Sequence, residues 1–304
     1  AFEVALFDGW LPQEKEDETK QTSKVEIHDI LKSSYAEYLA SKNSDLYKRD
    51  LRWAMNTFLK YLNTLSKKMI TIDELTPKTL YQFFALYPWS NRTKRNVRSS
   101  LVVLFGDSFK DNGLENPFSD LVFKKSKPAL HKPFKDVSIV LEDIKSFNEN
   151  LFLCCLLTYG CLLRPHQEIR NLKWGDFSED MKHISLSGRR NKSGRTRIVP
   201  LNPYILQYLN KGEDAINIFT NEEKPFNKDY FKTLWSRYKA QSNVLEDLQT
   251  LYSFRHTGAI EIYKRTGSLT TLQSAMGHAS LAVTLGYLRG LEIPSLRLEN
   301  MPRL

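Results

Sequence analysis

The sequence predicts a mainly α-helical protein with one small antiparallel β-hairpin, organised as two helical parts that a basic linker joins. Apolar residues recur at steps of three and four through most of the 304 residues, which is the period of a helix that buries one face. Strand-like alternation occurs in two short segments, 183–186 and 197–201. The stretch 116–136 has no helical period and is rich in lysine and proline, so it separates the two helical parts.

The first helical part is predicted to be a bundle of four helices within residues 25–115. Residues 1–24 are mixed in composition and are interpreted as a tail or the remnant of a preceding domain. Apolar positions then define the helices, which we expect at 25–39, 45–67, 72–87 and 92–111. Thr76-Pro77 is a typical helix start, because proline lacks the N–H group that the first helical turn leaves unused.

The charge of the chain favours a polyanionic partner. It carries 44 Lys and Arg against 35 Asp and Glu, which gives a formal net charge of +9. Between residues 91 and 135 the ratio is ten against four. We interpret the basic residues of the fourth helix and the linker as contacts to a phosphate backbone. These residues are Arg92, Lys94, Arg95, Arg98, Lys124, Lys125 and Lys127. A solvated helix face is the alternative explanation.

Residues 137–304 are interpreted as a second domain. It opens with helices at 141–150 and 151–163, and the second of these is apolar throughout, so we expect it to be buried. Arg164 follows, and Pro165 disfavours helical geometry at that arginine. A charge at the end of a buried element needs a partner or a ligand. The helical period then resumes at 168–174, and further helices are expected from residue 203 and at 228–240.

Composition argues against several other classes of protein. Cys154, Cys155 and Cys161 lie inside one apolar run, which indicates buried thiols in a reducing compartment, not disulfides or a metal site. No apolar run approaches the roughly 18 residues of a membrane span. The sequence has no glycine-rich phosphate loop and no carboxylate cluster of the kind that two-metal nucleases use.

A basic hairpin is predicted between the two strand segments. Lys192 lies near its tip, where a mobile loop could bring the ammonium group to a substrate as a proton donor. Arg190 and Arg195 flank this lysine and are interpreted as phosphate contacts. Arg190, Arg195 and Arg197 also compete with Lys192 for the role of donor.

Residues 251–290 hold side chains that are suited to attack a phosphodiester. Arg255 can bind a phosphate through two parallel N–H groups. His278 can move a proton near neutral pH. Tyr287, nine residues after the histidine, can act as a nucleophile once its proton is removed. Tyr252 can donate a further hydrogen bond to a phosphate oxygen.

Six residues together would supply every role in a metal-free cleavage. Two guanidinium groups would hold the non-bridging oxygens, a lysine would protonate the leaving oxygen, and a tyrosine would attack. The candidate catalytic residues are Arg164, Lys192, Tyr252, Arg255, His278 and Tyr287. Taken singly, several have structural alternatives, which are a helix cap for His278, a core position for Tyr287, and an ion pair of Arg255 with Glu261 or Asp247.

Three motifs follow one another in a specific order. They are Tyr159-Gly160-x-x-x-Arg164 with Glu168 and Leu172-x-Trp174-x-Asp176, then Arg255-His256-Thr257, then Gly277-His278-x-Ser280 with Tyr287. Each motif alone is weak evidence, but the ordered set resembles the tyrosine recombinases, also called phage-type integrases. In architecture, the resemblance covers about residues 25–300.

The resemblance implies a SAM-like helical core-binding domain at 25–115, a basic linker at 116–136, and a tyrosine-recombinase catalytic domain at 137–304. Residues 1–24 would be a tail or the remnant of an arm-binding domain. Arg164 and Arg255 would clamp the phosphate, Lys192 would be the general acid, and Tyr287 would form a 3′-phosphotyrosyl bond with DNA. Glu168 and Gly277 would support the site. The family pattern implies no cofactor, no metal ion and no ATP.

The same resemblance implies the partners and setting of the protein. The expected partner is duplex DNA carrying a recombination site, in the integration or excision of a mobile element. We expect a monomer in solution and a homotetramer on DNA, with DNA-bending accessory proteins and no membrane. The expected location is the bacterial cytoplasm, at the nucleoid.

Two positions depart from the family pattern. Tyr252 stands where the family usually has histidine, and a phenol with an unperturbed pKa of about 10 is a poor base at neutral pH. Glu168 follows Arg164 by four residues where three is usual, and we expect it to orient Arg164 or a nearby backbone group. Two alternatives to a recombinase stay open, which are a DNA-binding accessory protein without catalysis and a type IB topoisomerase-like enzyme.

Overall fold

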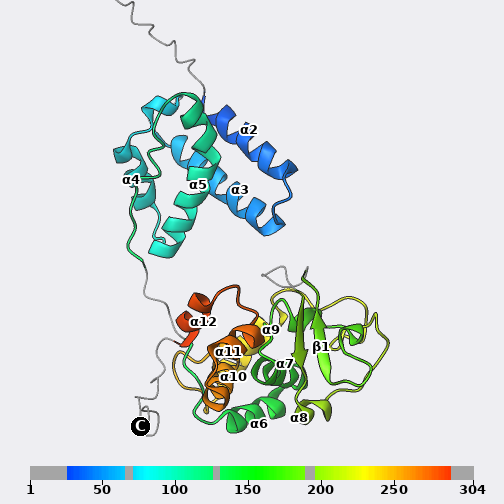
Figure 1. Ribbon diagram of the computed structural model, residues 1–304. Helices are drawn as coiled ribbons and strands as arrows, with labels where there is room; N and C mark the ends of the chain where they lie inside the picture. Colours follow the sequence, from blue (N-terminus) through cyan, green and yellow to red (C-terminus); the bar gives the residue numbers. More distant parts are fainter. Residues whose placement is uncertain (1–25, 66–70, 126–130, 189–195, 289–304) are drawn as a thin grey trace, which may run out of the picture. The chain divides into compact units, whose positions relative to one another are not determined.

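The computed structural model describes residues 26–65, 71–125, 131–188 and 196–288, and it divides the chain into two compact units (Figure 1). The first unit is Ala1–Pro128 and the second is Ala129–Leu304. Each unit has its own apolar core. In the described residues the secondary structure is mostly helical, with a two-stranded antiparallel sheet, which confirms the predicted fold class. None of the described helices is long and apolar enough to cross a membrane.

The first unit contains the four predicted helices. They are α2 (Ile27–Ala40), α3 (Asp45–Leu62), α4 (Pro77–Leu86) and α5 (Asn91–Asp111). Three of them begin at a hydroxyl cap, since Ser44, Thr76 and Ser90 each accept a hydrogen bond from a backbone N–H of the first turn. The predicted helix 72–87 is shorter than expected. A separate 3₁₀ turn, η1 (Ile72–Glu74), precedes it, and α4 starts at Pro77 because proline holds Thr76 extended.

Aromatic rings fill the core of the first unit. Phe58 of α3 packs edge-on against Phe83, Phe105 and Phe118, with ring centroids 5.1, 5.9 and 5.4 Å apart. Phe118 lies beyond the last helix of the bundle, in the stretch that the sequence assigned to the linker, and it is fully buried. Phe134, near the other end of that stretch, is buried in the core of the second unit.

The second unit is built around α7 (Glu149–Gly160) and α10 (Leu251–Thr266), which pack against each other. Gly258 sets how closely they approach, because a Cβ atom at this position would lie 2.3 Å from the carbonyl oxygen of Tyr159. The remaining helices surround this pair, and Figure 1 shows α11 beside α10. They are α6 (Val137–Phe147), α8 (Pro203–Leu206), α9 (Tyr230–Gln241), α11 (Leu269–Met276) and α12 (Leu281–Leu288).

The hairpin pairs β1 (His183–Leu186) with β2 (Arg197–Pro200) in antiparallel register, with Ile184 opposite Val199. Both of these residues are buried. The tip, which carries Lys192, Arg190 and Arg195, lies outside the described residues.

The helix predicted at 168–174 is wrong. The chain instead makes two single 3₁₀ turns, η2 (Ile169–Asn171) and η3 (Trp174–Asp176), with Leu172 and Lys173 extended between them. Lys173 forms an isolated bridge with Asn217, and its backbone N–H donates to the Asp176 carboxylate at 2.9 Å. These bonds take the place of helical ones, so a short apolar period could not distinguish the two structures.

The three cysteines are free and buried, as the apolar run indicated. Burial raises the pKa of all three thiols, and that of Cys161 to about 12. Thiols with such high pKa values are poor nucleophiles at neutral pH, so these side chains pack as small apolar groups.

Candidate active site

Arg255 lies on the second turn of α10 and is almost completely buried, with 2% of its surface exposed. Its Nη2 donates to the backbone carbonyl of Met276 at 2.7 Å. The bond ties α10 to the last turn of α11, the helix that leads to His278. Glu261, one of the alternative partners suggested by the sequence, pairs with Arg265 at 2.9 Å.

Arg164 and Glu168 lie together just beyond the end of α7. Glu168 is 1% exposed, and its two oxygens accept from the Arg164 guanidinium at 2.5 Å and from the Arg164 backbone N–H at 2.7 Å. The carboxylate therefore holds both the side chain and the backbone of the arginine, in spite of the four-residue spacing. Glu168 also accepts from Nη2 of Arg197 at 3.1 Å.

Arg197 lies at the start of the second strand, as the sequence predicted, but the direction of its side chain was not predicted. It is one of the three arginines that compete with Lys192 for the proton-donor role, and its side chain is buried against Glu168. Its Nη1 also donates to the carbonyl of Ala275 in α11 at 3.4 Å. The alternating pattern of β2 could have indicated an inward residue, since Arg197 and Val199 share the buried face.

Gly277 ends α11 in the left-handed conformation, with φ +63°. The turn places His278 directly after the helix, where its backbone N–H donates to the carbonyl of Gln273 at 3.1 Å. The ring Nδ1 of His278 lies 3.0 Å from the hydroxyl of Thr284, which is fully buried in α12. His278 thus connects the end of α11 to the helix that contains Tyr287.

Tyr287 belongs to α12, one turn after Thr284, and nothing is described of its side chain. The helix itself is anchored, since Leu288 packs with Leu162, Leu272 and Met276 in a small apolar cluster. The backbone of the candidate nucleophile is therefore held beside α11 and the end of α7.

The electrostatics of the site are dominated by arginine. The pKa of His278 is lowered to about 4 by burial and by the positive charges of Arg255, Arg164 and Arg197. Glu168 is a single carboxylate shared by Arg164 and Arg197. The potential at His278 therefore stays positive, and a positive potential favours the binding of an anion such as a phosphate.

This lowered pKa has a consequence for stability. The unfolded chain binds the His278 proton near its ordinary pKa of 6.5, whereas the folded protein binds it only near pH 4. The stability that the neutral imidazole contributes is complete above pH 6.5 and is lost as the pH falls towards 4.

We expect the free energy of unfolding, measured with urea, to fall between pH 7 and pH 4.5. The fall should be smaller in His278→Asn, and an equal fall in both proteins would contradict the assignment. Burial also lowers the pKa of His131, His166 and His256, so the comparison with His278→Asn isolates one ring.

Tyr252 stands on the first turn of α10 between two histidines. The ring of His131 stacks on it with centroids 5.6 Å apart, and His166 is tilted against it at 6.0 Å. The His131 ring is held in turn by the hydroxyl of Thr250, 2.9 Å from Nδ1. Burial raises the pKa of Tyr252, although Arg164 and Arg255 act to lower it. The phenol therefore keeps its proton at neutral pH and can act as a hydrogen-bond donor beside both arginines.

The residues that the sequence predicts as contacts to a phosphate backbone lie in the first unit or outside the described residues. Arg92, Lys94, Arg95 and Arg98 occupy the first turns of α5, and Lys124 and Lys125 are exposed near the end of the unit. The Nε atoms of Arg95 and Arg98 are buried and lack a hydrogen-bond partner within the described residues. Lys127, Arg190 and Arg195 lie outside those residues.

Two other lysines of the basic stretch are exposed but share one carboxylate partner. Lys132 and Lys135 both form ion pairs with Glu246 of the second unit, the second at 3.0 Å. The backbone between them is also bonded to this unit, since the Phe134 N–H donates to the Thr257 hydroxyl at 3.0 Å.

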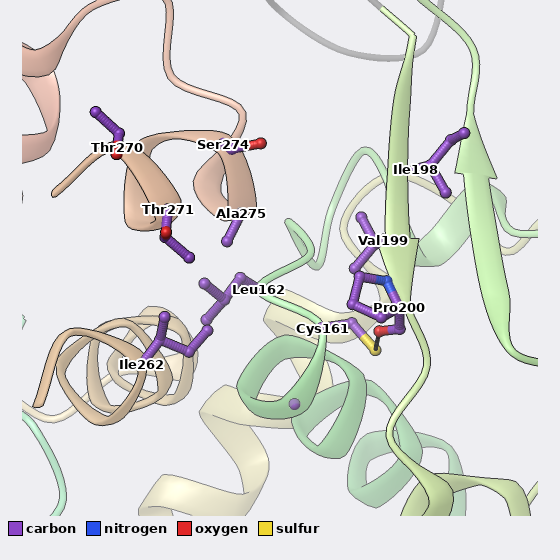
Figure 2. A pocket seen from close by; sticks show the side chains of 11 residues that line it. Cys161, Leu162, Ile198, Val199, Pro200, Ile262, Thr270, Thr271, Ser274 and Ala275 are labelled. Atoms are coloured by element: carbon purple, nitrogen blue, oxygen red, sulfur yellow. Dashed lines mark hydrogen bonds between the residues drawn. The ribbon is translucent and has the colours of Figure 1, made fainter. Parts of the chain in front are cut away.

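Two pockets lie between β2 and α11. Figure 2 shows the larger, of about 520 Å³, with Val199 and Pro200 of β2 facing Thr271 and Ala275 of α11. The second, of about 360 Å³, is lined by Arg197, Gln273, Gly277 and His278 among others, so it opens beside the candidate site.

The profile of the phage integrase family matches residues 137–292, which is more than half of the chain and includes every candidate catalytic residue. The chain belongs to the phage integrase family. This confirms the resemblance to the tyrosine recombinases that the ordered motifs indicated.

Curated relatives of the chain include two tyrosine recombinases. XerA of Pyrococcus furiosus is 26% identical over 242 residues, which cover 77% of this chain and 83% of the relative. The tyrosine recombinase XerC of Rhizobium meliloti is 26% identical over 271 residues, which cover 82% of this chain and 83% of the relative.

Solved structures of integrases share the fold. A lambda integrase dimer bound to a COC′ core site matches 90% of this chain and 100% of that chain, with a TM-score of 0.72 and 15% identity. The Tn1549 transposon integrase in complex with a circular intermediate DNA matches 84% of this chain and 94% of that chain, with a TM-score of 0.62 and 17% identity.

Proposed function

We propose that this tyrosine-type site-specific recombinase cuts and rejoins DNA through a covalent bond to Tyr287, in the integration or excision of a mobile element. The observation that carries the proposal is the cationic site at His278, where guanidinium groups from three separate parts of the second unit converge. Such a site fits a phosphodiester, since two of its arginines can hold the non-bridging oxygens as charge builds in the transition state.

The reaction balances without an outside energy source. The hydroxyl of Tyr287 gives its proton to His278 as its oxygen attacks the phosphorus, a new P–O bond forms to tyrosine, and the bond to the 5′-oxygen breaks. The 5′-oxygen leaves with a proton, which Lys192 supplies, and the 3′-phosphotyrosyl bond keeps the energy of the broken bond. Attack by a 5′-hydroxyl of a partner strand then reverses the step and releases Tyr287.

The other residues of the site have roles that follow from their charge. Arg164 and Arg255 bind the phosphate, and Glu168 fixes Arg164. Tyr252 keeps its proton and donates to a phosphate oxygen. A bound phosphate offsets the arginine charges that depress the pKa of His278, so the imidazole becomes a better proton acceptor when the substrate is in place.

DNA binding is assigned to the basic residues of both units. In the first unit these are Arg92, Lys94, Arg95, Arg98, Lys124, Lys125 and Lys127, and at the hairpin they are Arg190 and Arg195. The two buried, unpartnered Nε atoms of α5 support this assignment, because a phosphate oxygen would satisfy them. Assembly as a tetramer on DNA is supported by the fold shared with a lambda integrase tetramer bound to a Holliday junction, with a TM-score of 0.68.

The role in a mobile element is supported by the fold shared with the Tn1549 transposon integrase.

A nicked duplex with an end sequence of the element tests the proposal, because loss of the small fragment beyond the nick traps the covalent intermediate. We expect a denaturing gel to show a protein–DNA adduct. Binding without any adduct would instead identify a DNA-binding accessory protein. Adduct formation and relaxation of supercoiled DNA, with no exchange between two duplexes, would identify a topoisomerase-like enzyme.

Lys192 is the proposed general acid, and its neighbour Arg190 provides a matched control. Replacing Lys192 with alanine should lower the single-turnover cleavage rate on the order of 100-fold or more, because the leaving 5′-oxygen loses its proton donor. DNA affinity should change little. Arg190→Ala should mainly weaken binding. A bridging 5′-phosphorothiolate, whose sulfur leaves without a proton, should restore cleavage by Lys192→Ala. Rescue of Arg190→Ala alone would show that the donor is Arg190.

A further inference from the structure

Arg197 spans the space between the hairpin and α11. It is the first residue of β2, and only 9% of its side chain is exposed. One end of its guanidinium donates to Glu168 at 3.1 Å, and the other donates to the carbonyl of Ala275 at 3.4 Å. Figure 2 shows the two elements that it joins, with Val199 of β2 and Ala275 of α11 on opposite sides of the pocket.

The contact with Glu168 reaches Arg164. Oε2 of Glu168 accepts from Arg197 and also from the Arg164 backbone N–H, while Oε1 accepts from the Arg164 guanidinium. Arg197 therefore fixes the orientation of the carboxylate that in turn fixes Arg164. A carboxylate held from one side only could rotate and release one of these bonds.

The contact with α11 reaches His278. A Cβ atom at Gly277 would lie 2.8 Å from Nη1 and 3.0 Å from Cδ of Arg197, so the arginine packs directly against the peptide that leads to His278. Gly277 already needs its left-handed φ of +63° to end the helix. Glycine at this position thus serves two purposes. It adopts the left-handed conformation of the turn, and it leaves room for the side chain of Arg197.

The arrangement is not an efficient way to stabilise a fold. Desolvation lowers the pKa of Arg197, and its Nε lacks a hydrogen-bond partner within the described residues. A buried ion pair often contributes no more to stability than apolar side chains of similar volume. An unbranched apolar residue could fill the same space, so the benefit of arginine lies in the two positions that it fixes.

We infer that Arg197 is a positioning residue, which holds Arg164 through Glu168 and His278 through the end of α11 in one geometry around the phosphate. The inference rests on the proposed function, because it concerns the geometry of that phosphate site. Arg197 also contributes positive charge at His278, together with Arg164 and with Arg255 from α10, while Thr284 of α12 faces the same ring.

The test compares Arg197→Met and Arg197→Lys with the wild type on the nicked duplex. In Arg197→Met we expect single-turnover cleavage to fall about 100-fold, the scale of a misplaced catalytic group. DNA affinity should stay within about threefold, since the Arg197 side chain is buried and already bonded within the protein. Lysine keeps the charge but cannot reach both partners, so its rate should lie between the two. The acid limb of the pH–rate profile should move to higher pH in Arg197→Met, because His278 loses a positive neighbour.

Two controls separate this role from a general loss of structure. Arg265→Met removes an exposed arginine of the same unit and should leave the cleavage rate unchanged. Gly277→Ala should slow cleavage less in the Arg197→Met background than in the wild type, because the steric contact with the guanidinium is gone. Wild-type cleavage by Arg197→Met, or a loss of rate that only follows a loss of folded protein in both variants, would overturn the inference. If the wild type itself forms no adduct, it is the proposed function that fails.

Discussion

Replacing Tyr287 with phenylalanine is expected to abolish covalent attachment to DNA. The change removes one oxygen atom, which is the atom proposed to attack the phosphorus, and it leaves the ring in place. Loss of a nucleophile lowers a chemical rate on the order of 10⁴-fold or more, so no adduct should be visible on the denaturing gel. Binding to the nicked duplex should be unchanged within about threefold, because the arginines that hold the phosphate remain.

Tyr263→Phe is the matched control for that experiment. Tyr263 lies on α10 within the same unit, and it has no part in the proposed reaction. It should form the adduct at the rate of the wild type. An adduct that persists in Tyr287→Phe and disappears in another tyrosine variant would assign the nucleophile elsewhere.

Replacing Glu168 with alanine is expected to cause the largest loss of stability. The carboxylate is 1% exposed and pairs with two guanidinium groups, which would then be left together without their anion. Removing one partner from a buried ion pair costs about 3–5 kcal/mol, and urea unfolding should report a loss of this size. Cleavage should fall as well, because Arg164 loses the group that orients it.

The exposed pair Glu261–Arg265 is the control for Glu168. Its carboxylate is 43% exposed, and an exposed pair contributes about 0–1 kcal/mol. Glu261→Ala should therefore unfold at nearly the urea concentration of the wild type. If Glu168→Ala and Glu261→Ala were equally stable, the buried network around Glu168 would not have the importance assigned to it.

The sequence was sufficient to predict the elements that have strong local signals. Thr76 caps a helix, the hairpin strands alternate, and the apolar run ending at Leu163 is buried. These features depend on neighbouring residues, so a single chain contains the information for them. The family followed from the order of the motifs along the chain, which the sequence also contains.

The sequence was not sufficient where distant parts of the chain meet. Arg197 was one basic residue among several in the hairpin, and only its approach to Glu168 and Gly277 distinguishes it. The two histidines around Tyr252 come from separate segments, which no spacing in the sequence brings together. The turns at 168–174 depend on Asn217, so their short apolar period was read as a helix.

The chemical identity of the DNA-linked residue is the most direct test of the account. The adduct formed on the nicked duplex can be digested with a nuclease and a protease, and the nucleotide-bearing peptide can be sequenced by mass spectrometry. The account predicts one modified residue, Tyr287, joined to a 3′-phosphate, and a free 5′-hydroxyl on the released strand that a polynucleotide kinase can label. A nucleotide on any other residue, or a 5′-phosphate on the released strand, would contradict it.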